Sequence, residues 1–237
     1  MKGKTMKMTN NPTRRDFLRS SAVAGAAIVS PFFVPSSVFG ANAPSNRIAI
    51  GCIGVGGMGM NDLKAIISKP QTQVLAVCDV ETGSKDYGGY YKGRDLGREP
   101  AKRYTEKYYA GKAPSGTYKG CAAYIDFREL LARGDIDAVT VVTPDQWHVP
   151  ISVAAARAGK DIYCEKPLTL TIKGGRVLAD TVKRYGRILQ TGSMQRSAQE
   201  FRFACELVRN GRIGKLHTIE VGIPKNNVKN PLNWKPE

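Results

Sequence analysis

The sequence predicts an α/β protein built on a doubly wound, parallel sheet, with the start of a second α+β domain near its end. Three observations support this prediction. Short β-branched runs alternate with longer amphipathic segments after residue 46, which is the pattern of βαβ units. A glycine-rich turn directly follows the first of these runs. The run Asp137–Thr143 is apolar along its length, as in a strand buried between two helical layers.

The expected elements follow in chain order. Strands are expected over Arg47–Ile53, Gln73–Cys78, Asp137–Thr143, Asp161–Cys164, Arg187–Thr191 and Leu216–Ile223. Helices are expected over Met60–Ser68, Glu99–Tyr109, Phe127–Arg133, Ile151–Ala158, Ile172–Tyr185 and Gln199–Arg209. Between them, 81–97 and 111–120 have little hydrophobic periodicity and are expected to be loops. The parallel connections are expected to be right-handed.

The N-terminus has the features of an export signal. Arg14 and Arg15 precede Phe17 and Leu18, a mildly apolar stretch runs from residue 22 to 34, and Ala41-Asn42-Ala43 offers small residues for cleavage. This combination is typical of a twin-arginine signal peptide over residues 1–43, which directs a folded protein to the periplasm. An uncleaved anchor is disfavoured because the stretch contains Pro31, is followed directly by Pro35, and is shorter than the ~20 apolar residues of a spanning helix.

Net charge and cysteine content argue against two other classes of protein. The formal charge is +16, but residues 1–45 hold six of the basic residues and one acid, and the rest form no long Lys/Arg run. We therefore expect a solvated basic surface and no nucleic-acid partner. The five cysteines have no CxxC pair, so neither a disulfide framework nor a metal site is expected.

The glycine-rich turn is the first motif that carries chemistry. Residues 54–59 read Gly54-Val55-Gly56-Gly57-Met58-Gly59, the GxGxxG pattern, between an expected strand and an expected helix. Gly54 permits the tight turn, Gly56 lets a pyrophosphate approach the backbone, and Gly59 lets the helix pack closely. Free N–H groups at the helix N-terminus favour the anion. The motif predicts a dinucleotide site in a Rossmann-type domain.

Asp79 ends the second expected strand, 20 residues beyond Gly59. A carboxylate at this position binds ribose hydroxyls and disfavours a 2′-phosphate, so the expected cofactor is NAD, with NADP less favoured.

Two further strand ends carry candidate site residues. Thr143, Pro144, Trp147 and His148 follow the apolar strand, and we expect this loop to face the ligand crevice. Trp147 would cover the cofactor. His148 would make a polar contact or transfer a proton, or alternatively cap the next helix. His217, which alternates with apolar residues, is expected to be structural.

The next strand ends in Glu165-Lys166-Pro167. Such a pair is often only a surface ion pair. Beside a bound nicotinamide, however, a lysine can bind the substrate hydroxyl and assist proton removal as hydride leaves.

Together these motifs resemble the Gfo/Idh/MocA oxidoreductase family. The resemblance spans roughly residues 46–223. It rests on GxGxxG, the strand-end Asp79, Thr143-Pro144 with His148, Glu165-Lys166-Pro167, the loop 192–196, and the helix that begins the second domain at 205–214. It implies an NAD(P)-dependent sugar or cyclitol dehydrogenase in which Lys166 and His148 are the catalytic candidates and Glu165 supports Lys166.

By the same resemblance, the cofactor contacts are Gly54, Val55, Gly56, Gly57, Met58, Gly59, Asp79, Thr143, Pro144, Trp147, His148, Glu165, Lys166 and Met194. Met194 replaces a residue that is more often polar in the family, and Met58 replaces an arginine of many members, which favours NAD further. The domains expected are a signal peptide over 1–43, an NAD-binding domain over 46–193, and the start of a substrate-binding domain over 194–237, truncated at Glu237.

Three functions remain open at this point. The first is an exported oxidoreductase that moves hydride between the nicotinamide and a carbohydrate hydroxyl carbon. The second is a glycosidase-like enzyme on the same fold, which oxidises, eliminates and re-reduces without net redox change. The third is an NAD-binding domain without catalysis. A carbohydrate substrate is the expected partner, with no stable membrane insertion after signal cleavage, and a homo-oligomer is expected.

Overall fold

The computed structural model describes residues 46–85 and 91–223. The expected signal peptide and the last residues of the expected second domain lie outside the described residues. The division into three domains stays a prediction.

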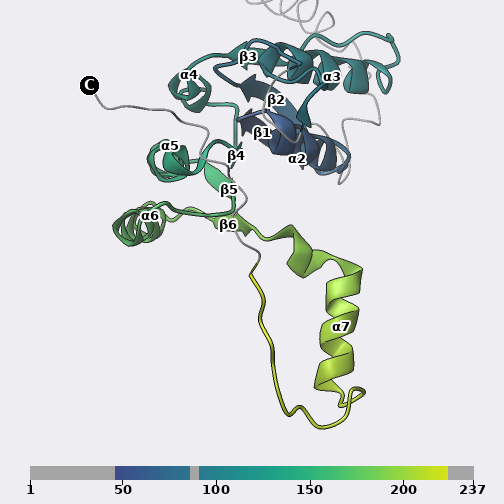
Figure 1. Ribbon diagram of the computed structural model, residues 1–237. Coiled ribbons are helices and arrows are strands. Elements are labelled where there is room, and N and C mark those ends of the chain that lie inside the picture. The colour runs from purple at the N-terminus through teal and green to yellow at the C-terminus, as the bar shows by residue number, and fades with distance from the viewer. Residues whose placement is uncertain (1–45, 86–90, 224–237) are drawn as a thin grey trace, which may run out of the picture.

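The centre of the protein is a parallel sheet of six strands (Figure 1). The strands are β1 (Ile48–Ile53), β2 (Thr72–Cys78), β3 (Ala122–Tyr124), β4 (Ala138–Val141), β5 (Asp161–Glu165) and β6 (Leu189–Gly192). Their spatial order is β3-β2-β1-β4-β5-β6, and every neighbouring pair is parallel. This is the strand order of the Rossmann fold, and it reverses between β1 and β4. The predicted fold class is confirmed.

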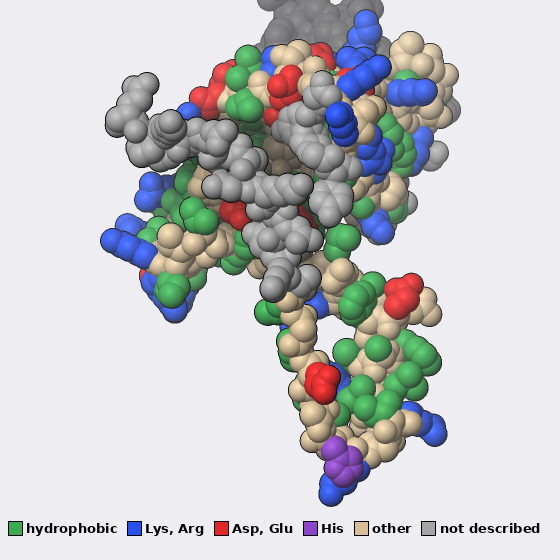
Figure 2. Space-filling view, in the orientation of Figure 1, with side chains coloured by type: hydrophobic (Ala, Val, Ile, Leu, Met, Phe, Trp, Pro, Cys, Tyr) green, Lys and Arg blue, Asp and Glu red, His purple; other side chains and the backbone are tan. Residues whose placement is uncertain are grey.

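Helices cover both faces of the sheet. They are α2 (Gly57–Ile67), α3 (Arg98–Ala110), α4 (Phe127–Leu131), α5 (Asp145–Arg157), α6 (Ile172–Arg184) and α7 (Gln199–Arg209), with a short 3₁₀ turn η4 (Met194–Ser197). Side chains of α2 and α3 fill one core cluster, and those of α4, α5 and α6 fill the other. Helix α7 projects away from the sheet beyond β6 and has no buried residue (Figures 1 and 2).

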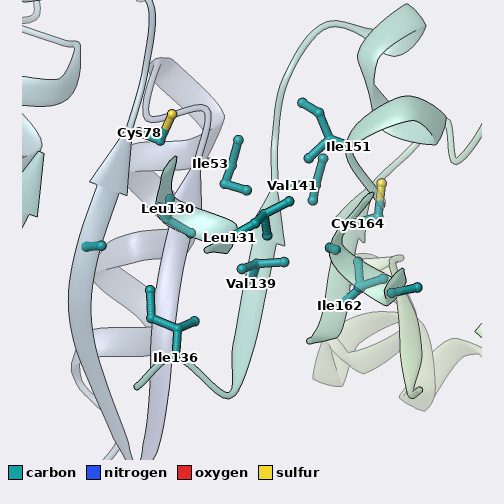
Figure 3. Packing of buried hydrophobic residues seen from close by; sticks show 13 residues of the cluster. Ile53, Cys78, Leu130, Leu131, Ile136, Val139, Val141, Ile151, Ile162 and Cys164 are labelled. Carbon is teal, nitrogen blue, oxygen red and sulfur yellow. The ribbon is translucent and has the colours of Figure 1, made fainter. Parts of the chain in front are cut away.

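The two clusters explain why the strands are apolar on both sides. Val139 and Val141 of β4 pack between α4 and α5, together with Ile162 of β5 (Figure 3). On the opposite face, Cys52 and Val77 contact the apolar stripe of α2. Burial of such side chains contributes about 1.5–3 kcal/mol each, which fixes the register of the central strands.

Three expectations about secondary structure are wrong. Strand β3 was not expected, because three residues are too few to show an alternating pattern. Helix α5 begins at Asp145, six residues earlier than expected, because Pro150 normally marks a boundary but here lies inside the helix. The expected strand Leu216–Ile223 is absent and its residues are exposed, since no described strand lies beside it to supply hydrogen bonds.

The thiols are unpaired in the described part of the chain. Cys52, Cys78, Cys121 and Cys164 are buried, whereas Cys205 is exposed. Burial is the main cause that raises the pKa of Cys52, Cys78 and Cys121 to about 12 and that of Cys164 to about 11. Four of the five cysteines are therefore small buried side chains of the core.

Among the described helices, none is both long enough and apolar enough to cross a membrane.

Candidate functional site

The glycine-rich turn joins β1 to α2 at the carboxyl edge of the sheet. Gly54 has φ of 80°, and its N–H donates to the carbonyl of Cys78 at 2.9 Å. A Cβ on Gly54 would collide with the Val142 carbonyl, and one on Gly59 would collide with the carbonyl of Gly54. The backbone of the turn therefore lies against both β4 and its own helix, the close packing that the sequence predicted for these glycines.

The N-terminus of α2 has no side-chain cap among the described residues. Gly56 is the N-cap, no side chain caps the helix, and no acidic residue lies in its first turn. The first N–H groups of a helix have no partner within the helix, so they remain available together with the positive end of the dipole. Gly57 has its own reason to be glycine, because a Cβ there would collide with the ring of Tyr91.

Replacing Gly59 with alanine is expected to lower the free energy of unfolding by about 2 kcal/mol. Helix propensity alone would favour alanine by about 1 kcal/mol, but the methyl group collides with the Gly54 carbonyl, and overpacking costs about 3 kcal/mol. Thermal unfolding followed by circular dichroism measures the change. Gly134→Ala is the control, since its Cβ would meet open space. Equal melting temperatures for the two variants would contradict the close packing.

Asp79 is buried at the end of β2 and holds the glycine turn. Its exposed fraction is 5%. Oδ2 accepts the N–H of Val55 at 2.8 Å, and Oδ1 accepts the N–H of Glu81 at 3.0 Å. The carboxylate is thus oriented before any ligand arrives, which lowers the entropy lost on binding.

Arg98 fixes the turn that follows Asp79. Its Nη1 donates to the carbonyls of Asp79 and Val80 at 3.2 and 3.0 Å, and its Nη2 donates to Thr82 Oγ1 at 2.6 Å. The guanidinium is committed to these acceptors. Sequence reasoning missed this residue, because an arginine at the start of a helix carries no pattern of its own.

A pocket of about 410 Å³ lies at the carboxyl ends of β1, β2, β3 and β4. It is lined by Ile53, Gly54, Cys78, Asp79, Val80, Ile125, Asp126, Phe127, Arg128, Val142, Thr143, Pro144, Trp147 and Ile151. Five predicted site residues from three separate motifs therefore meet here: Gly54, Asp79, Thr143, Pro144 and Trp147. The segment 125–128 was missed because β3, which it follows, was missed. Ligands of open α/β sheets bind at such an edge.

Glu165 and Lys166 lie at the end of β5, outside the lining of that pocket. Glu165 is 4% exposed, its Oε2 accepts the Lys166 N–H at 3.0 Å, and its Oε1 accepts the Tyr163 hydroxyl at 3.3 Å. A Cβ on Gly192 of the neighbouring strand would collide with the Glu165 carboxylate. Lys166 itself is exposed. The carboxylate thus orients the backbone of the lysine, and no ion pair between the two side chains is found.

The remaining predicted site residues differ in exposure. His148 is 1% exposed and lies inside the first turn of α5, so the expectation that 143–148 forms one loop is wrong from Asp145 onward. Met194, in η4, is 59% exposed. Met58 is half-buried in α2, and Val55 and Gly56 are buried in the turn.

Asp62 of α2 is a further acidic residue close to Glu165 that the sequence did not indicate. Its Oδ2 is buried without a hydrogen-bond partner among the described residues. Burial, and then the charge of Glu165, raise the pKa of Asp62 to about 6. Burial, and then the charges of Asp62 and Glu165, raise the pKa of Tyr163 to about 12. These shifts indicate one group of acidic side chains between α2 and β5.

The raised pKa of Asp62 predicts a pH-dependent stability. The protonated Asp62 contributes to the free energy of unfolding. This contribution is fully present below the unfolded pKa of about 4 and is lost as the pH rises through the folded pKa of about 6. After allowance for solvent screening, Asp62→Asn is expected to stabilise the protein by about 1 kcal/mol at pH 8, and this difference should vanish toward pH 4. Thermal unfolding across this range measures it, with Asp180→Asn, an exposed position on α6, as control. A constant difference between parent and Asp62→Asn would contradict the assignment.

Comparison with known protein families identifies the family that shares this fold. The sequence pattern of the oxidoreductase family with an NAD-binding Rossmann fold, Gfo/Idh/MocA, matches residues 48–193. The chain belongs to this family. A twin-arginine translocation signal matches residues 11–30, so this Gfo/Idh/MocA protein is exported by that pathway, which in a bacterium leads to the periplasm.

Relatives of this Gfo/Idh/MocA chain include carbohydrate-active proteins. A glycosyl hydrolase family 109 protein of Saccharopolyspora erythraea is 30% identical over 87% of the chain, and an α-N-acetylgalactosaminidase of Shewanella oneidensis is 27% identical over 87% of the chain. The chain covers 45% of each, so it spans just under half the length of the curated relatives it matches.

Solved structures of similar fold include a dehydrogenase. The scyllo-inositol dehydrogenase of Lactobacillus casei, with bound NAD(H) and scyllo-inositol, has a TM-score of 0.54 and 25% identity over 71% of this chain and 42% of that chain. The myo-inositol 2-dehydrogenase of Lactobacillus plantarum has a TM-score of 0.55 and 23% identity, over 71% of this chain and 43% of that chain, a likeness of fold.

Proposed function

We propose that this chain binds NAD and serves an exported oxidoreductase that moves hydride between the nicotinamide and a hydroxyl-bearing carbon of a sugar or cyclitol. The observation that carries the proposal is the junction of β1, α2 and β2. There the buried Asp79 carboxylate binds the glycine turn, beside an uncapped helix N-terminus. A carboxylate for the ribose and free N–H groups for the pyrophosphate are the two requirements of this cofactor.

The residues fit NAD better than NADP. Asp79 lies at the place where a 2′-phosphate would have to bind, and its charge repels that group. Arg98 is held by two carbonyls and a hydroxyl, so its guanidinium would have to give up these bonds to meet a phosphate. The apolar pocket that includes Ile125 and Trp147 offers room for the adenosine.

Lys166 is the residue we assign to substrate. When bound, the cofactor would accept the hydride from the substrate carbon. The exposed amine of Lys166, at the carboxyl edge beyond β5, would bind the substrate hydroxyl and take its proton as the carbon is oxidised. Glu165 would keep the backbone at Lys166 in place through its bond to the lysine N–H.

A second candidate is a glycosidase-like enzyme that uses the bound NAD transiently. It is favoured by the names of the relatives, a family 109 glycosyl hydrolase and an α-N-acetylgalactosaminidase, which match 87% of this chain. Such a reaction would need the same cofactor junction and the same lysine, but would end without net reduction of NAD.

Mass spectrometry of nucleotide released from the purified protein tests the proposal first. Bound NAD is expected, in excess of NADP. The protein is then supplied with inositols and simple sugars, and in parallel with an aryl N-acetyl-α-galactosaminide. Net formation of reduced nicotinamide would support the dehydrogenase, whereas release of the aryl group without it would support the second candidate. A folded protein that neither carries nor takes up NAD would refute both.

A further inference from the structure

His148 connects the first turn of α5 to the turn that follows β5. Its ring Nδ1 lies 2.7 Å from the carbonyl oxygen of Pro167. The side chain is 1% exposed, and its Nε2 is buried with no hydrogen-bond partner among the described residues. The ring thus has one bond, to the backbone next to Lys166, and no contact with solvent.

The chemistry of the acceptor fixes the tautomer. A carbonyl oxygen only accepts, so Nδ1 carries the hydrogen and donates it to Pro167. A proton delivered to Nε2 would create a buried charged N–H group without an acceptor, which is strongly unfavourable. A role for His148 in proton transfer would therefore need the helix to open, whereas a role as donor to Pro167 needs no change.

The bond holds the turn that presents Lys166. Two hydrogen bonds fix the backbone of residues 165–167. Glu165 Oε2 accepts the N–H of Lys166, and His148 Nδ1–H donates to the carbonyl of Pro167. The first bond comes from the turn itself, but the second reaches across 19 residues of sequence to another element. Among the described residues, no other hydrogen bond joins α5 to the backbone of residues 165–167.

We propose that His148 is a positioning residue, whose Nδ1–H bond to Pro167 fixes the Lys166 turn for reaction. This inference rests on the proposed function, in which Lys166 binds the substrate hydroxyl. The sequence left open a polar contact, proton transfer or the capping of a helix, and this inference favours the polar contact, made to the backbone of a neighbouring turn. Since His148 acts through Lys166, it need not touch the substrate.

Three substitutions of His148 test the proposal, because they differ in the position of the hydrogen-bond donor that could reach the Pro167 carbonyl. Asparagine places its amide nitrogen near the position of Nδ1, glutamine places it near Nε2, and leucine has no donor. Hydrogen exchange of the backbone amides in residues 166–171 and the turnover number kcat are measured for His148→Asn, His148→Gln and His148→Leu. Ser152→Ala, one helical turn further along α5 and equally buried, is the control.

Leucine and glutamine are expected to speed exchange in 166–171 about 10-fold and to lower kcat about 10-fold, as loss of one buried hydrogen bond predicts. Asparagine is expected to restore both to within about 3-fold of the parent. Equal loss of kcat in all three variants with unchanged exchange would overturn the proposal in favour of proton transfer. Exchange that asparagine fails to restore would overturn it as well. The exchange measurement needs no turnover, so it tests whether His148 holds the turn at 165–167 even if the parent protein proves to bind no NAD.

Discussion

Replacing Lys166 with methionine is expected to reduce turnover about 1000-fold while the nucleotide stays bound. Methionine has nearly the same length but neither the charge nor the proton-accepting amine, and a positioned acid–base group contributes about 10²–10⁴-fold to rate. Lys166 lies outside the pocket lined by Asp79 and Trp147, so NAD affinity should change little. Steady-state rates with the best sugar or cyclitol, and nucleotide content by mass spectrometry, give the two readouts.

Lys173→Met, an exposed lysine in the first turn of α6, is the matched control and should leave the rate unaltered. Turnover of Lys166→Met at the rate of the control would remove Lys166 from the mechanism. Loss of nucleotide together with turnover would instead indicate that Lys166 acts on the cofactor rather than on the substrate.

Asp79→Ala is expected to weaken NAD binding about 100-fold or more. The variant loses charge-assisted hydrogen bonds to the ribose, each worth about 1.5–3 kcal/mol. It also leaves the N–H groups of Val55 and Glu81 without their acceptor, which loosens the turn. NADP binding should fall less, because the variant also removes a charge that repels the 2′-phosphate. Isothermal titration with both nucleotides measures the two affinities.

Asp126→Asn removes the same charge from the same pocket and serves as control. Asp126 is the N-cap of α4, and asparagine caps a helix equally well. NAD affinity that falls equally in both variants would show that the pocket needs negative charge in general and would contradict a specific role for Asp79.

The arrangement of the glycine turn and Asp79 could be predicted because its signals are local. Gly54, Gly59 and Asp79 follow strands that β-branched runs make evident, and the carboxyl ends of parallel strands must share one edge. Five predicted residues meet in one pocket for this reason. Strand β3 could not be predicted, because its three residues are too few for a pattern and it is defined by its pairing with β2.

Other features depend on contacts that no short pattern carries. The proline at 150 concealed the start of α5, so His148 was expected in a loop and lies buried in a helix. The charge of Glu165 acts on Asp62 only because the fold brings α2 near the end of β5, which the spacing of two acids 103 residues apart does not reveal. Leu216–Ile223 has the alternation of a strand, but alternation needs a partner strand to become a sheet.

The buried thiols bear on whether the protein folds before or after it is exported. Thiol oxidation requires the thiolate, and burial holds four of the five cysteines as neutral thiols. A chain that crossed the membrane unfolded would carry all five, an odd number, into an oxidising compartment and could form wrong bridges before it folded. A chain that is exported folded presents Cys205 alone. Export in the folded state by the twin-arginine route thus protects the buried thiols of the core from oxidation.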